Sequence, residues 1–167
     1  MNKNDLMLLF AYNRWANARV LEACKALTQD ELNAPAQVSF GSLMGNLVHI
    51  LDAEWVWRVR MQGGASPTRM PAVEDFPTLA DLIAHWQSEE AAMQQFIEGL
   101  QPEDLERWVE FRTTSGSPQA STLWKALAHV TFHGMQFRAE AGSALGAMGH
   151  SPGDLDMILF LRETNQR

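Results

Sequence analysis

The sequence is poor in cysteine, with a single one, Cys24, among 167 residues. One thiol cannot form an internal disulfide, and without CxxC pairs the chain cannot build a zinc ribbon or a dithiol redox site. No apolar run approaches the roughly 18 residues that cross a bilayer. No signal peptide is visible at the N-terminus. We therefore expect a cytoplasmic protein with no membrane partner.

Basic residues are also scarce. Lys and Arg number 13 against 20 Asp and Glu, which gives a net charge of −7 and a pI near 5.1. A net anion binds phosphate backbones poorly, so we expect no nucleic-acid partner. The apolar share of 46% and the charged share of 20% are ordinary for globular proteins. The length predicts one domain over residues 1–167.

Apolar residues recur at helical spacing in four long segments, which cover residues 5–27, 42–62, 78–100 and 121–148. Strand signals are confined to residues 108–121, where we expect a small hairpin, and a short final helix is expected at 154–162. The predicted fold is all-α, a four-helix bundle. The connection at 63–77 is long enough to join two parallel helices, whereas a short turn would force antiparallel neighbours.

The expected helix ends carry recognisable capping residues. Asp5 is the expected N-cap of the first helix. The pattern Thr28-x-x-Glu31 is a capping box that predicts one extra helical turn. Thr78 is expected to open the third long helix, and Gly149 to stop the fourth.

Histidine spacing gives the main candidate for chemistry. His129 and His133 lie four residues apart on one face of the fourth long helix, in a stripe that continues to Glu140. Imidazole is a common metal ligand, but two such rings also form hydrogen-bonded pairs or face solvent. His49 is the natural third ligand, because catalytic zinc sites usually have three protein ligands. A helical wheel nevertheless puts His49 beside Asn46, away from the apolar stripe, which favours a solvent-facing position.

Three segments resemble one known family. They are YNRWANARVLEA (12–23), FGSLMGNLVHILDAEWVWRVRMQG (40–63) and AHVTFHGMQFRAEAGSALGAMGHSPGDLDMILFL (128–161). Together they resemble the first, second and fourth helices of DinB-type proteins. The resemblance implies a bundle with an up-down-down-up course, frequent homodimers, and a divalent metal, often nickel or zinc, held by three histidines.

Within that resemblance, His49 and His133 match two of the family's three ligands. The third falls on Phe137, which cannot donate to a metal, and the Arg-Gly-Gln that commonly follows is Arg138-Ala139-Glu140 here. Three outcomes stay open: His129 replaces the missing ligand, His49 and His133 bind metal weakly with waters or Gln136, or metal binding is lost. Glu140 is a candidate outer-shell acceptor or catalytic base.

The resemblance therefore predicts a DinB-like metal-dependent enzyme of hydrolase or thiol-dependent transferase type. Its metal would lie between the second and fourth long helices, and its partner would be a small-molecule substrate. The alternative is a metal-free dimeric binding module that has lost the third ligand. If His49 and His133 share one ion, their ring nitrogens must lie about 3–4 Å apart.

Overall fold

The computed structural model describes residues 1–63, 67, 69–113 and 116–165. Its long helices are α1 (Lys3–Cys24), α3 (Leu43–Met61), α4 (Leu79–Gly99) and α5 (Leu123–Ala147), and its short helices are α2 (Gln29–Asn33) and α6 (Met157–Glu163). The 3-10 turn η1 (Val73–Asp75) precedes α4, and the 3-10 turn η2 (Pro102–Glu106) follows it. Strands β1 (Trp108–Arg112) and β2 (Pro118–Thr122) pair antiparallel. The expected helical bundle with one hairpin is therefore confirmed.

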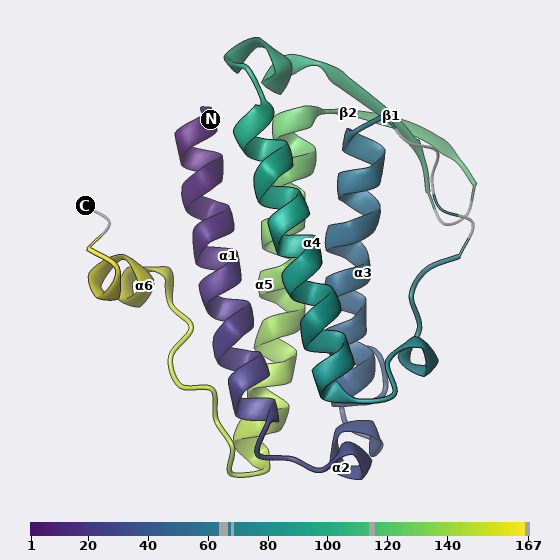
Figure 1. The fold of residues 1–167 in the computed structure, drawn as a ribbon, viewed down its shortest axis with the longest axis vertical. Coiled ribbons are helices and arrows are strands. Elements are labelled where there is room, and N and C mark those ends of the chain that lie inside the picture. Colours follow the sequence, from purple (N-terminus) through teal and green to yellow (C-terminus); the bar gives the residue numbers. More distant parts are fainter. Residues whose placement is uncertain (64–66, 68, 114–115, 166–167) are drawn as a thin grey trace.

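The four long helices follow an up-down-down-up course, as Figure 1 shows. Helices α1 and α5 run in one direction, and α3 and α4 run together in the other. The connection that leads to residue 78 runs back along the bundle. It returns the chain to the end of the bundle where α3 began, so that α4 can run in the same direction as α3. The prediction that this long connection joins parallel helices is confirmed. Within it, residues 64–66 and 68 lie outside the described part of the chain.

Helix ends mostly follow their capping residues. The capping box expected at Thr28 is present, and Thr78 opens α4 as expected, with a capping box of its own. The start of α1 differs, because Asn2 is the N-cap and accepts a hydrogen bond from the backbone N–H of Asp5 at 3.0 Å. Asp5 returns the bond to the backbone of Asn2 at 2.8 Å. Asp5 is thus the third residue of the capping box, so the prediction that it caps the helix was wrong.

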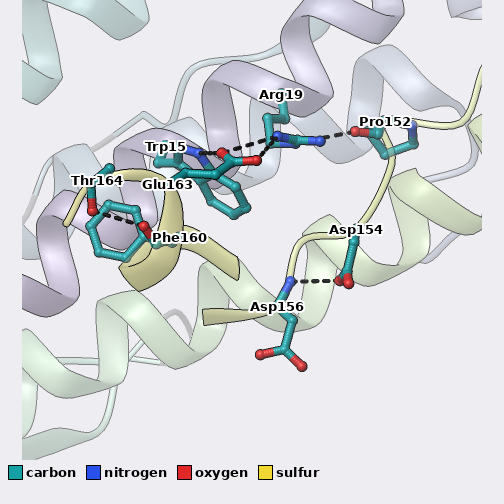
Figure 2. Close-up of polar contacts among 8 residues, drawn as sticks. All are labelled: Trp15, Arg19, Pro152, Asp154, Asp156, Phe160, Glu163 and Thr164. Carbon is teal, nitrogen blue, oxygen red and sulfur yellow. Dashed lines mark hydrogen bonds and ion pairs between the residues drawn. The ribbon is translucent and has the colours of Figure 1, made fainter. Parts of the chain in front are cut away.

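The C-terminal segment folds back onto α1 (Figure 2). Glu163 accepts hydrogen bonds from Trp15 Nε1 at 3.1 Å and from Arg19 Nη1 at 3.4 Å. Arg19 also donates to the carbonyl of Pro152 at 3.4 Å, and Phe160 packs on the Trp15 ring with centroids 5.7 Å apart. None of the helices among the described residues is both long and apolar enough to span a membrane.

Candidate metal centre

Helices α3 and α5 pack against each other and bring His49 and His133 into direct contact. Their Nε2 atoms lie 3.1 Å apart. Between neutral rings, one Nε2–H donates and the other Nε2 accepts. The side chain of His49 is only 21% exposed, so the solvent-facing position suggested by the helical wheel was wrong. The wheel failed because α3 has a second buried face, on which Asn46 is fully buried and donates to the carbonyl of Phe137.

Asp52 supports this pair from one turn further along α3. Its Oδ1 lies 3.5 Å from His49 Nδ1, and its side chain is 13% exposed. This separation is an ion-pair distance rather than a hydrogen bond. A carboxylate that closes onto the second ring nitrogen would fix the tautomer of a metal-ligating histidine and leave Nε2 for the ion. The sequence analysis missed Asp52, although its spacing of three residues from His49 on a helix was a usable signal.

His133 is held in its neutral form. Burial, followed by the nearby imidazoles of His49 and His129, lowers the pKa of His133 to about 4. A ring that stays unprotonated well below neutral pH keeps its nitrogen lone pair, and only the neutral ring can bind a metal. His133 is therefore available as a nitrogen donor over the physiological pH range.

Two phenylalanines enclose the pair. The ring centroid of Phe137 lies 4.6 Å from that of His49 and 4.6 Å from that of His133. Phe137 is 8% exposed and belongs to the apolar core. It therefore occupies the place expected for the third ligand. Phe40 stacks on His49 at 3.7 Å and is 45% exposed, so it covers the pair from the solvent side.

His129 lies farther from this pair. Its ring centroid is 5.6 Å from that of His133 and 5.0 Å from that of Trp57, which it meets edge to face. Burial and the charge of Arg60 lower the pKa of His129. Within the described ranges, no three His, Cys, Asp or Glu side chains are placed to share an ion. The metal-ligand role of His129 stays a prediction.

Glu140 has a structural contact that the sequence did not reveal. Its Oε2 accepts from the backbone N–H of Ser39 and its Oε1 from the Ser39 hydroxyl, each at 2.8 Å. These bonds tether residues 36–41, here called the cover loop, to α5. Because Phe40 follows Ser39, Glu140 helps to hold the Phe40 ring over His49. A catalytic role for Glu140 stays a prediction.

A second polar cluster lies in the bundle interior. Glu54, which is 4% exposed, accepts hydrogen bonds from Asn13, Asn17 and Trp86 at 2.6, 3.1 and 3.2 Å. The same two asparagines accept from Arg138, which is 2% exposed. The cluster links all four long helices through hydrogen bonds to buried charges, which are costly to break. It fixes the helix arrangement that brings His49 and His133 together.

Comparisons with known proteins identify the family and a similar fold. The DinB family model matches residues 1–167. The chain belongs to the DinB family. It is 23% identical over 164 residues to Protein DinB of Bacillus subtilis (strain 168), covering 95% of each chain. Its fold is similar to a solved structure described as "YfiT from Bacillus subtilis is a probable metal-dependent hydrolase with an unusual four-helix bundle topology". That match has a TM-score of 0.70 and 15% identity, over 90% of this chain and 91% of the other.

Proposed function

We propose that this DinB-family protein is a metal-dependent enzyme of hydrolase or thiol-dependent transferase type. In this proposal, Nε2 of His49 and Nε2 of His133 hold a divalent ion, nickel or zinc. The observation that carries the proposal is their separation of 3.1 Å. Two nitrogens bound to one tetrahedral ion at 2.0–2.1 Å lie about 3.3 Å apart. The small adjustment needed is within the reach of ring rotation.

The donor set fits an ion held by two protein ligands. Asp52 supports His49 in the manner of an outer-shell partner, and His133 is neutral. Phe137 takes the place of a third imidazole, so water or substrate would complete the coordination. Such a site binds more weakly than three imidazoles, because each ligand contributes binding energy and geometry.

The metal, when bound, would polarise a carbonyl or lower the pKa of a bound water. The residues of this chain would orient the ligands and limit the access of water. Asp52 would orient the His49 ring from 3.5 Å, and the two phenylalanines would limit water at the pair. The description of the structurally similar YfiT as a probable metal-dependent hydrolase supports the enzyme class.

Metal titration of chelator-treated protein tests the proposal. We expect the wild type to bind one zinc or nickel ion per chain and to gain thermal stability. His133→Ala and His49→Ala should both lose this binding. His85→Ala is the matched control, because His85 lies on α4 against Phe76 and should leave binding unchanged. Equal binding by all three variants would place the ion elsewhere.

The second candidate is a metal-free binding module. The burial of Phe137 beside both histidines favours it, because an apolar ring there lowers metal affinity. In that case, His49 and His133 form only a hydrogen-bonded pair. The wild type would then bind no metal in the titration, and alanine at either position would cost stability without any metal dependence.

We extend the proposal to a homodimer with a small-molecule substrate. Phe132 and Met135 on α5 are 56% and 48% exposed, and Ile158 on α6 is 61% exposed. Large exposed apolar side chains mark interaction surfaces where they form a patch, and Phe132 and Met135 lie three residues apart on α5. Light scattering of the wild type should give twice the chain mass of 18.7 kDa, and a Phe132→Glu, Met135→Glu variant should give the monomer mass.

A further inference from the structure

The histidine pair is the middle of a longer line of stacked and edge-on rings. Adjacent ring centroids along this line lie 3.7, 4.8, 5.6, 5.0 and 4.8 Å apart. The line, here called the ring row, consists of Phe40, His49, His133, His129, Trp57 and Phe111. It is assembled from the cover loop, α3, α5 and β1, which are far apart in sequence.

A positive charge closes one end of the ring row. The Arg60 guanidinium carbon lies 5.0 Å from the centroid of Trp57 and 5.4 Å from that of Phe111. Arg60 also donates to the backbone carbonyl of Arg112 at 3.0 Å. Two ring faces and a strand carbonyl therefore fix the plane of the guanidinium. This positive charge is a local feature, in contrast to the net charge of −7 on the whole chain.

The row offers ring surface to solvent near this charge. His129 is exposed, and Trp57, Arg60 and Phe111 are half-buried rather than enclosed. Exposed aromatic surface favours a flat partner, because ring pairs gain energy beyond the area they bury. A fixed guanidinium favours a carboxylate, because hydrogen bonds between charged partners are stronger than those between neutral groups. Both features lie near His129, which adjoins His133 in the row.

We propose that the ring row binds a small planar carboxylate, with the carboxylate at Arg60 and the flat body against Trp57 and His129. This inference rests on the proposed function, since it names the ligand class of the same site. Arg60 is then a positioning residue that sets substrate choice. The ligand would lie along the row toward His133, where its reacting group would meet the metal.

Three matched probes separate charge from shape in chelator-treated protein at pH 8, where ordinary imidazoles are neutral. Benzoate is planar and anionic, cyclohexanecarboxylate is anionic but not planar, and benzyl alcohol is planar but neutral. Histidine ring signals followed by NMR report both the site and the affinity. We expect benzoate to bind about tenfold more tightly than either other probe, with the largest shift at His129.

Substitutions at Arg60 provide the decisive comparison. Arg60→Gln should reduce benzoate affinity to that of benzyl alcohol, whereas Arg60→Lys, which keeps the charge without the planar fork, should give an intermediate value. The control Arg162→Gln, at an exposed position on α6, should bind benzoate like the wild type. Circular dichroism shows whether each variant folds. If Arg60→Gln is unfolded, the Arg60→Lys comparison carries the test.

Several results would overturn this inference. They are equal affinity for benzoate and benzyl alcohol, unchanged benzoate binding in Arg60→Lys or in folded Arg60→Gln, and shifts centred away from the ring row. The metal proposal fails separately, because these titrations contain no metal. Benzoate binding without metal binding would refute only the metal centre, and metal binding without benzoate binding would refute only the ligand class.

Discussion

Replacing Phe137 with histidine should convert a weak two-imidazole site into a tight three-imidazole site. The Phe137 ring lies 4.6 Å from both His49 and His133, so an imidazole in the same place would direct a nitrogen at the same point. Outer-shell partners are worth about 10–100-fold in metal affinity. A direct ligand should contribute more, so we expect zinc to bind at least about 100-fold more tightly.

This gain has a measurable thermal consequence. At a zinc concentration equal to the wild-type dissociation constant, the wild type gains about 0.4 kcal/mol and Phe137→His about 2.7 kcal/mol. For a chain of this length, the difference corresponds to a rise in Tm of about 5–9 °C on adding zinc. Without metal, the variant should be less stable than the wild type by about 1–3 kcal/mol, because a polar ring replaces a buried apolar one.

The assay is a zinc titration against a chromogenic chelator, paired with thermal unfolding with and without zinc. Phe137→Leu is the matched control, since it keeps an apolar side chain and supplies no nitrogen. If Phe137→His and Phe137→Leu bind zinc equally, then position 137 does not face the point shared by the two histidines, and the reasoning is refuted.

Three further predictions concern other parts of the molecule. Gly134→Ala would place a Cβ 2.6 Å from a buried guanidinium nitrogen, so we expect urea unfolding to show a loss of about 1–3 kcal/mol. Gly146→Ala has no such neighbour within 4 Å and should gain about 0.5–1 kcal/mol, so a gain at both positions would contradict the close approach. Burial, then a neighbouring buried carboxylate, raises the pKa of Glu90 to about 7, so its contribution to stability is full below about pH 4.5 and is lost as the pH rises through 7. In Glu90→Gln, the free energy of unfolding in urea should not fall over this pH range. If the wild type and the variant show the same pH dependence, the raised pKa of Glu90 is disproved. Ser39→Ala removes one of the hydrogen bonds that hold the cover loop, so diethyl pyrocarbonate should modify His49 faster. If mass spectrometry shows an unchanged rate, the cover loop does not shield His49.

The helices were predictable because local signals and periodicity agree. The capping boxes at Thr28 and Thr78 fix two helix starts through contacts only three residues apart. Gly149, with φ of 83°, marks the end of α5 in a conformation that glycine adopts without strain. At α1 the sequence analysis named only Asp5, whereas Asn2 is the N-cap and Asp5 completes the capping box from three residues further on.

The surroundings of the site were less predictable, because they depend on contacts between distant residues. Phe40 stacks on His49, and its neighbour Ser39 is bound by Glu140, which is 101 residues away. The helical wheel misplaced His49 because it assumes one buried face per helix, whereas α3 also buries polar side chains such as Glu54. Polar residues on a second buried face look exposed in sequence until their partners are known.

The most direct test of the account follows the histidine ring nitrogens by NMR while zinc is added to chelator-treated protein. The chain has five histidines, so there are five sets of ring signals to assign. We predict that zinc shifts the Nε2 signals of His49 and His133 together, reaching its full effect at one ion per chain, while the His85 signals change little. Movement of neither ring, or of only one of them, would contradict the claim that these two imidazoles share one ion.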